Sequence, residues 1–410
     1  MMVVHTTAPR AGFSGTPLII GLIGFLTLVD LFAAQAILPS LAARYEASPS
    51  AIGFAVNAST IGMAIAGVLI VFVGGRLNRR TGVVASLVAL SLPTLALSVA
   101  PDLATFTGLR IVQGLFMVTA FSLTMSYLAE RCSAAQSATA LAAYVTGVVA
   151  SNLVGRLVAG SVTDGFGVPA NFVFFAGLNL AGAVVAFIAL KSARPMTNGG
   201  EAARSPFIII ADHLGNACLR TSFAIGFLIL FAFIGVFTYV NFVLAAPPLA
   251  LSPMALGLVY FVFLPSMITT PAAGRIAARY GARLSFFGSL GLTLAGLPML
   301  VSTSLPLVLA GLAIVGVGAF FAQATATGFV GRAAKHDRAA ASGLYLSSYY
   351  LGGLAGAALL GRVFDAFGWP ATVAAIAASI ALAGALAAML KPSTAEPARD
   401  RRATLNEPAH

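Results

Sequence analysis

The sequence predicts an all-α membrane protein with twelve transmembrane helices, arranged as two pseudo-symmetric six-helix bundles. The first observation is composition: 59% of the 410 residues are hydrophobic and 9% are charged, whereas soluble domains have about 45–50% apolar and about 25% charged residues. The second is that apolar runs of about 20 residues, the length that crosses a bilayer, recur along the whole chain. The third is that the two halves of the chain resemble each other.

Twelve apolar runs remain when the chain is divided at clusters of charged residues, Pro and Gly. These runs are residues 18–40, 51–73, 82–100, 103–128, 136–162, 169–190, 217–242, 253–273, 284–302, 305–330, 339–361 and 369–390. The longest polar segment between runs divides them six plus six. We therefore expect an N-terminal bundle (1–190), a cytoplasmic linker (191–216), a C-terminal bundle (217–390) and a cytoplasmic tail (391–410).

The internal repeat consists of one short match and one long match. The segment "GRLNRRTG" in the first half is matched by "GRIAARYG" in the second. Residues 138–167 align without gaps with residues 339–368, which places Gly160 on Gly361. Repeated bundles related by an axis along the membrane normal usually hold their substrate near the midplane, between the halves.

The net charge of +11 is explained by topology. With the N-terminus inside, 19 of the 23 Lys and Arg residues lie on the cytoplasmic side, and the exceptions are Arg44, Arg110, Arg156 and Arg362. Because cytoplasmic loops are enriched in Lys and Arg, we expect an inner (plasma) membrane protein with both termini cytoplasmic. The basic clusters are short and lack interleaved aromatic residues, so they predict contact with anionic lipid headgroups and no nucleic-acid binding.

Two opposite charges lie at similar depth in the predicted membrane region. Asp30 is roughly 18 Å from the cytoplasmic end of the first run, and Arg110, on the fourth run, is at roughly 20 Å. An ion at mid-helix costs about 2.5–3.5 kcal/mol to insert. We therefore expect each to face a partner or a water-filled cavity.

Four motifs resemble those of the major facilitator superfamily, and the resemblance covers essentially the whole chain. "GRLNRRTG" is similar to the loop between the second and third helices, "RIVQG" (110–114) to the fourth-helix motif and "GRLVAG" (155–160) to the fifth-helix motif; Asp30 followed by Pro39 resembles the first helix. The fifth-helix motif and "YLSSYYLGGLAG" (345–356) look most like the drug:proton antiporter branch of inner-membrane exporters, in particular the YnfM-like proteins. The resemblance implies the major facilitator fold.

The resemblance also implies roles for motif residues. The gating motif of the loop and its second copy comprises Gly75, Arg79, Arg80, Gly82, Gly274, Arg275 and Gly281, and the fifth-helix motif includes Gly155 and Gly160. This sequence departs from the family in three places. Arg79 and Ala278 occupy positions where the family has Asp, and Arg156 occupies a position where it has Pro.

In this family, helices 1, 4, 7 and 10 line the central cavity, so the resemblance makes Asp30 and Arg110 partners. A carboxylate gains a proton when it is desolvated and loses it beside a cation. We therefore expect Asp30 to carry the coupling proton and Arg110 to modulate its affinity. The alternative is a permanent ion pair that only sets the register of the two helices.

Polar side chains within the runs are candidate substrate contacts. Gln113 lies one turn from Arg110 and shares its helix face, which makes it the first candidate; the others are Asn57, Arg156, Tyr239, Asn241 and Gln323. Tyr239 and Asn241 also suit a gate at the outer end of the seventh helix. The alternative for such residues is interhelical hydrogen bonding, worth about 0.6 kcal/mol each.

Arg156 has two interpretations that the sequence leaves open. In the first it reaches toward the periplasm or pairs with Asp164, and in the second it binds an anionic substrate.

The sequence predicts a transporter and not an enzyme. It contains no HExxH, GxSxG or Walker motif, and its four His residues lie away from mid-membrane, so we expect no metal and no cofactor. We expect proton-coupled export of a small organic compound by alternating access, with the small-molecule substrate, protons and membrane lipids as partners of a monomer. The alternatives are a proton symporter or uniporter for a small anion or sugar, and a membrane-embedded sensor.

Overall fold

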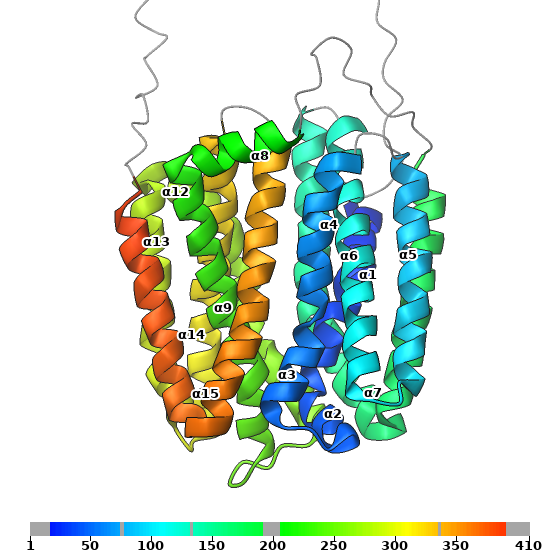
Figure 1. Cartoon of the computed structure of the whole chain (residues 1–410), viewed down its shortest axis with the longest axis vertical. Coiled ribbons are helices and arrows are strands. Elements are labelled where there is room, and N and C mark those ends of the chain that lie inside the picture. The colour runs from blue at the N-terminus through cyan, green and yellow to red at the C-terminus, as the bar shows by residue number, and fades with distance from the viewer. Residues whose placement is uncertain (1–16, 74–77, 132–133, 192–205, 335–337, 391–410) are drawn as a thin grey trace, which may run out of the picture.

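The computed structural model describes residues 17–73, 78–131, 134–191, 206–334 and 338–390, and these are helical almost throughout (Figure 1). Within these ranges, ten helices are long and apolar enough to cross a membrane. Two of the ten, α7 (Ala134–Ala189) and α15 (Arg338–Ala388), each contain two of the predicted spans. The predicted all-α fold with twelve spans in two bundles is confirmed.

A glycine makes the turn inside each of these two long helices. Gly167 has φ 83° and Gly368 has φ 74°, a backbone region that side chains with a Cβ rarely adopt. Two residues later the chain has Pro169 or Pro370, and Pro suits the first turn of a new helix because its missing N–H is not needed there. The repeated Gly-x-Pro sequence therefore joins two spans without a loop.

The other helices of the first half follow in chain order. They are α1 (Pro17–Ala36), α2 (Leu38–Tyr45), α3 (Pro49–Asn57), α4 (Ser59–Val73), α5 (Arg79–Ala96), the 3-10 turn η2 (Leu97–Val99) and α6 (Leu103–Arg131). The second half contains α8 (Pro206–Gly215), α9 (Ala217–Ala245), α10 (Pro253–Val259), η3 (Tyr260–Phe263), α11 (Leu264–Thr269), η4 (Thr270–Ala272), α12 (Ala273–Tyr280), α13 (Ala282–Gly296), η5 (Leu297–Val301) and α14 (Leu305–Ala333).

Three predicted spans are interrupted helices. The run 18–40 divides between α1 and α2, the run 51–73 divides at Ala58, and the run 253–273 contains the two 3-10 turns η3 and η4. Proline explains part of this, because Pro39, Pro265 and Pro271 are the second residues of α2, α11 and η4 and lack the N–H that would continue a preceding helix.

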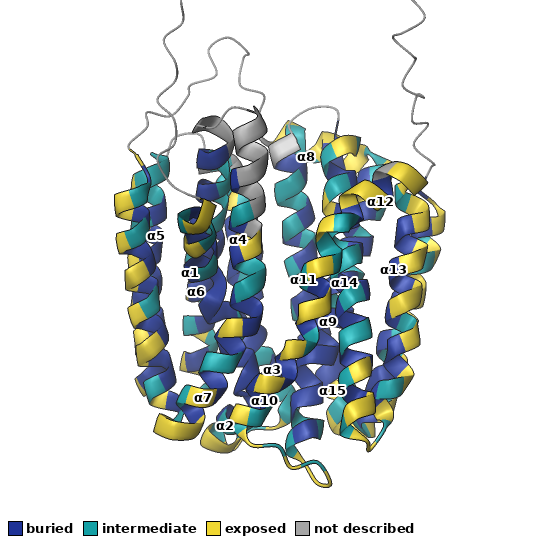
Figure 2. Ribbon diagram, turned by 180° about the vertical axis from the view of Figure 1, so that it is seen from behind, coloured by how far each residue is buried: buried dark blue, intermediate teal, exposed yellow. Residues whose placement is uncertain are grey.

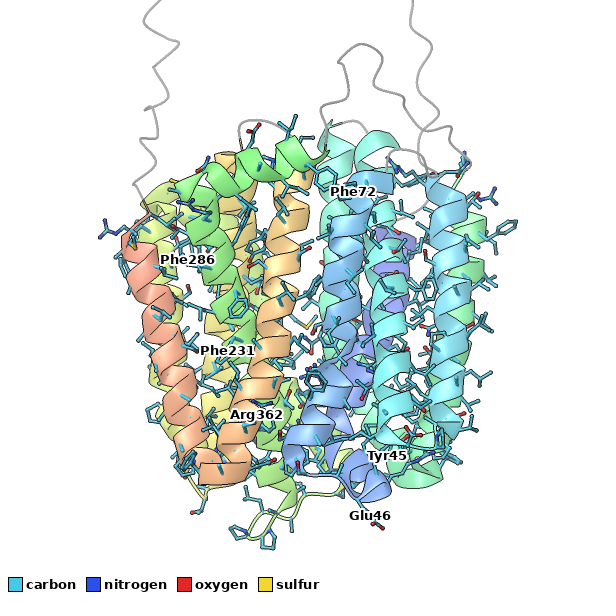
Figure 3. The ribbon with its side chains drawn as sticks, viewed as in Figure 1. Tyr45, Glu46, Phe72, Phe231, Phe286 and Arg362 are labelled. Carbon is cyan, nitrogen blue, oxygen red and sulfur yellow. The ribbon has the colours of Figure 1, made fainter. Side chains whose placement is uncertain are left out.

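One helix lies where the sequence predicted a polar linker. Residues 206–215 form α8, which runs across one end of the molecule (Figure 1). Its Phe207 packs against Phe72 of α4, with ring centroids 5.5 Å apart, and Figure 3 labels Phe72 at this end.

The two halves lie side by side and share a core at the end opposite α8 (Figures 1 and 2). Ile52 and Val56 of α3 belong to one buried cluster with Val240 of α9. In the first half, residues nearer α8, such as Ile20 and Leu87, belong to a separate cluster. Tyr45, Glu46 and Arg362 mark the shared end in Figure 3. We call this end, which carries α2, α3 and α10, the closed end.

Related helix starts contribute to the closed end in both halves. Ser48 accepts a hydrogen bond from the backbone N of Ala51 at 3.2 Å, and Ser252 accepts one from Ala255 at 3.3 Å. Each serine is followed by Pro, so α3 and α10 begin with the same cap. A glycine four residues after each Pro, Gly53 or Gly257, then faces the opposite half of the molecule.

Candidate functional site

Asp30 is the centre of a buried polar network inside the first half. It lies in α1 and is 1% exposed. Its Oδ2 accepts hydrogen bonds from Thr94 Oγ1 at 2.6 Å, from Gln113 Nε2 at 2.7 Å and from Asn179 Nδ2 at 3.3 Å. Its Oδ1 is buried and has no hydrogen-bond partner. Three neutral side chains from α5, α6 and α7 thus converge on one oxygen of the carboxyl group.

Arg110 is fully buried in α6 and every nitrogen of its guanidinium has an acceptor. Nε donates to the carbonyl of Val56 at 2.9 Å and Nη1 to Gln113 Oε1 at 2.7 Å. Nη2 donates to the carbonyl of Leu31 at 3.4 Å and to Ser59 Oγ at 3.3 Å. Carbonyl and hydroxyl dipoles therefore solvate this cation in place of water.

The structure places Asp30 and Arg110 in one network but separates them by Gln113. The amide of Gln113 accepts from Arg110 and donates to Asp30, so the predicted partnership is relayed rather than direct. The i, i+3 spacing that put Gln113 on the same helix face as Arg110 accounts for the first contact. Thr94 and Asn179 complete the network and were not singled out by sequence reasoning, although Asn179 is a polar residue within the apolar run 169–190.

Arg156 lies in a second buried network, between the two halves. It is on α7 and fully buried, and Nη2 donates to Oε1 of Gln35. Its guanidinium carbon lies 3.9 Å from the ring centroid of Tyr260 and 5.2 Å from that of Phe263. Arg156 thus neither reaches the surface nor pairs with Asp164, which is exposed. The first interpretation of Arg156 offered by the sequence is wrong, because an aromatic shell encloses the side chain.

Gln35 continues this network across the closed end. Its Nε2 donates to Asn57 Oδ1 at 2.9 Å, and Asn57 Nδ2 donates to Thr238 Oγ1 at 3.1 Å. Asn57 belongs to the first half and Thr238 to the second, so a chain of side-chain hydrogen bonds joins the halves. Gln35, like Thr94, was missed by sequence reasoning.

The remaining candidate contacts occupy different places. The hydroxyl of Tyr239 donates to the carbonyl of Ala357 and lies against Gly53 and Gly361 at the closed end. Asn241 Oδ1 accepts from the hydroxyl of Tyr260 at 3.0 Å, next to Arg156. Gln323 of α14 is half-buried and belongs to neither network.

The glycines of the fifth-helix motif permit close helix contacts. A Cβ on Gly155 would lie 2.8 Å from the carbonyl oxygen of Val29, the residue before Asp30. A Cβ on Gly160 would lie 2.5 Å from the carbonyl oxygen of Pro253, which belongs to α10 in the other half. The first glycine therefore lets α7 approach the Asp30 network, and the second lets it approach the opposite half.

The loop motif lies at the end that carries α8. Arg80 donates from Nη2 to the carbonyl of Phe187 at 2.7 Å and stacks on its ring at 4.3 Å, while Arg79 begins α5. A Cβ on Gly82 would collide with Leu123. In the second copy, Gly281 adopts φ 85° between α12 and α13. Gly274 and Arg275 are exposed, and Gly75 lies outside the described residues.

Two surface hollows of the described structure lie outside these networks. One, of about 650 Å³, lies between α12, α13 and α14 and is lined by apolar residues such as Ile276, Leu284 and Val317. Another, of about 630 Å³, is lined mainly by α9 and α15. Because neither is lined by any of the candidate site residues, the chemistry of the buried networks is the better guide to the functional site.

Comparison with known proteins agrees with this architecture. A family model described as Major Facilitator Superfamily matches residues 20–266 and 239–409. Two curated relatives are "Uncharacterized MFS-type transporter YybF" of Bacillus subtilis (strain 168), 25% identical over 93% of this chain and 95% of the relative, and "Inner membrane transport protein YnfM" of Escherichia coli (strain K12), 28% identical over 88% of this chain and 86% of the relative.

Solved structures share the fold at low sequence identity. The nucleoside transporter NupG has a TM-score of 0.74 and is 13% identical, with 92% of this chain and 100% of that chain covered. A D-xylose-proton symporter has a TM-score of 0.74 and is 16% identical, with 92% and 97% covered. The chain belongs to the Major Facilitator Superfamily and is a multi-pass membrane transporter, not an enzyme.

Proposed function

We propose that this transporter exports a small organic compound in exchange for protons, and that Asp30 carries the coupling proton. The observation that carries the proposal is the geometry of Asp30: a carboxyl group buried within α1, with three donors on Oδ2 and an unpartnered Oδ1. Membrane-level carboxylates of this kind mark proton pathways in pumps and transporters. Oδ1 is the oxygen on which the proton would reside.

The relay through Gln113 favours a proton switch over a permanent ion pair. When Asp30 is neutralised, Arg110 keeps the carbonyls of Val56 and Leu31 and the hydroxyl of Ser59 as acceptors. Protonation of Asp30 therefore does not leave a buried cation without partners. Removal of one member of a direct buried ion pair does leave such a cation, and it costs about 3–5 kcal/mol. Arg110 still acts on Asp30 through its charge, which favours the ionised carboxylate.

The proposed direction of transport rests on the motif resemblance to drug:proton antiporters. The printed name of the relative YnfM, an inner membrane transport protein, supports placement in the inner membrane. We place both termini in the cytoplasm because the Lys and Arg distribution follows the positive-inside rule. In that orientation the closed end faces the periplasm, and we propose that a monomer in contact with membrane lipids performs the cycle.

Transport by reconstituted protein tests the role of Asp30. A thermal-shift panel of chemically diverse small molecules first identifies a transported ligand, whose gradient-driven movement and counterflow exchange are then measured in proteoliposomes. We expect Asp30→Asn to abolish transport driven by a pH gradient and to retain counterflow. Gradient-driven transport that persists in Asp30→Asn would contradict the assignment.

Asp102→Asn is the matched control. Asp102 accepts a hydrogen bond from the backbone N of Thr105 at 2.7 Å, which holds the pKa of its carboxyl group below the usual value. Asn can cap the same helix start. This exposed carboxylate lies outside both networks, so its variant should couple normally.

The sign of the gradient separates antiport from its alternatives. An acidic vesicle interior drives uptake by an antiporter, whereas an acidic exterior drives uptake by a symporter, and a uniporter responds to neither. Symport of a small anion is the second candidate, because Arg156 is a buried cation with unused donors.

A further inference from the structure

Arg156 is a buried cation whose hydrogen-bonding capacity is largely unused. Both Nε and Nη1 are buried and have no acceptor, and the hydrogen bond from Nη2 goes to Gln35, a neutral amide. Within the described part of the chain, no carboxylate contacts this guanidinium. Burial of an unpaired charge is expensive, and an anion is the group that would reduce the cost most.

Arg110 shows that the fold can supply acceptors to every nitrogen of a buried guanidinium. Each of its three nitrogens has an acceptor, supplied by Val56, Gln113, Leu31 and Ser59. Both arginines are fully buried in the same half of the molecule. The contrast indicates that Nε and Nη1 of Arg156, which have no acceptor, are available to a ligand.

The surroundings of Arg156 indicate what kind of ligand this is. Aromatic rings cover the side chain, with centroids at 3.9 Å (Tyr260), 5.2 Å (Phe263), 5.5 Å (Phe32) and 6.0 Å (Phe237) from the guanidinium carbon. Stacking uses the faces of a guanidinium, whereas carboxylates bind its N–H edge. The site thus offers an anion-binding edge beside a shell that suits an aromatic or apolar body.

The shell is divided between the two halves of the transporter. Arg156, Phe32 and Gln35 belong to the first half, whereas Tyr260 and Phe263 belong to η3 of the second. Next to it, the backbones of α7 and α10 meet at Gly160 and Gly257. A Cβ on Gly160 would lie 2.5 Å from the carbonyl oxygen of Pro253, and a Cβ on Gly257 would lie 3.0 Å from that of Arg156. Separation of the halves at the closed end would withdraw η3 and uncover the guanidinium edge.

We propose that Arg156 binds the carboxylate of a small organic anion, with the aromatic or apolar body of that anion held by the surrounding rings. Opening of the closed end would release the bound anion on the periplasmic side, the direction that the proposed export requires. This proposal rests on the proposed transport function, because it names the substrate class that the same transporter carries. It assigns the two buried arginines different tasks: Arg110 acts on the coupling carboxylate, and Arg156 recognises substrate.

Binding of matched probes to the purified full-length protein tests the proposal. Benzoate and cinnamate are compared with the neutral benzamide and cinnamamide by thermal shift and calorimetry. We expect the two carboxylates to bind and the amides to bind at least about tenfold more weakly, since the loss of a charge-assisted contact corresponds to a factor of this order. Equal binding of acids and amides, or no binding of either acid, would overturn the proposal.

Three variants locate the site. Arg156→Gln should abolish carboxylate selectivity, and Arg156→Lys should keep the charge while weakening binding, because Lys lacks the planar fork of Arg. Arg362→Gln is the control, since Arg362 is exposed on α15 (Figure 3), and it should bind the acids as the wild type does. If Arg156→Gln does not fold, Arg156→Lys carries the test alone, and unchanged affinity in that variant refutes the site.

The two proposals fail in different ways. Asp30→Asn should retain benzoate binding, because Asp30 does not contact Arg156, and should lose gradient-driven transport. Benzoate binding that depends on Arg156 without proton-driven flux refutes the proposed coupling and leaves the anion site standing. Proton-driven transport of a neutral compound, with no preference for carboxylates, refutes the anion site and leaves the proposed coupling standing.

Discussion

The side-chain amide of Gln113 donates to Oδ2 of Asp30 at 2.7 Å, and this contact keeps the buried carboxyl group apart from the nearest buried cation. Because the same amide accepts from Arg110 at 2.7 Å, Gln113 can hold Asp30 and Arg110 in register without pairing them. The arrangement therefore separates two tasks that a direct ion pair would merge, namely solvation of the cation and release of the proton.

Removing the amide should weaken the fold as well as coupling. Gln113→Ala leaves Nη1 of Arg110 without its acceptor and removes one donor from Asp30, and a buried polar group left unsatisfied costs about 1–3 kcal/mol. We expect a lower apparent midpoint of thermal unfolding in detergent, with gradient-driven transport reduced. Gln323→Ala is the control for stability, since Gln323 is half-buried outside the network; equal losses in the two variants would contradict a bridging role.

Close contact at Gly160 should hold the two halves together at the closed end. Gly160→Val would place a Cβ 2.5 Å from the carbonyl oxygen of Pro253, and a collision that costs about 1.4 kcal/mol shifts the conformational equilibrium tenfold. Ser50 lies against Gly361, so Ser50→Cys reports opening of the closed end through its reaction with a membrane-impermeant maleimide. Cys132 and Cys218 are replaced by Ser in this protein. We expect faster labelling in Gly160→Val.

Gly165→Val is the matched control for this experiment. Gly165 lies in the same helix, and a Cβ there would meet no atom within 4 Å. In Gly165→Val, the labelling rate of Ser50→Cys should equal the rate measured when both Gly160 and Gly165 are unchanged. Equal acceleration by both valines would show that helix propensity, and not contact between the halves, controls the opening.

Tyr239 should be energetically coupled to Gly361. The tyrosine hydroxyl lies where a Cβ on Gly361 would be placed, so Gly361→Ala should destabilise by about 1–3 kcal/mol through overpacking. Tyr239→Phe loses the hydrogen bond to Ala357, worth about 0.5–1.5 kcal/mol, but removes the colliding atom. The double variant should therefore lose less stability than the sum of the single losses.

Thermal unfolding of the four proteins in this cycle measures the coupling. Gly384→Ala provides the control, because Gly384 lies in the same helix in open space. Combined with Tyr239→Phe it should give additive effects. Additivity in the Gly361 cycle as well would contradict the contact.

The number and order of the spans could be predicted from the sequence because each depends on the length and composition of one segment. The connection between the fifth and sixth spans shows where this kind of inference stops. The pattern placed a gap at 163–168, whereas α7 continues through it and bends at Gly167. A single backbone angle makes this turn, and apolar periodicity does not report backbone angles.

The candidate site was partly predictable for a similar reason. Asp30 and Arg110 are rare charges in apolar runs, and Gln113 follows Arg110 by three residues, so local pattern was enough to single them out. Thr94, Asn179 and Gln35 were missed because neutral polar residues are common in membrane helices. Which of them meet depends on how α5 and α7 pack on α1, and this is a tertiary property.

The hydrogen-bond chain through Asn57 should stabilise contact between the halves. Asn57→Ala leaves Gln35 Nε2 without its acceptor and removes the donor to Thr238, and interhelical bonds of this type are worth about 0.6 kcal/mol on average and up to about 1.7. Asn171→Ala is the contrasting variant, because neither polar atom of this buried asparagine has a hydrogen-bond partner. We expect Asn57→Ala to lower the unfolding midpoint and to speed labelling at Ser50→Cys, while Asn171→Ala leaves labelling unchanged and stability unchanged or higher. The reverse ranking would show that the Asn57 chain does not hold the closed end together.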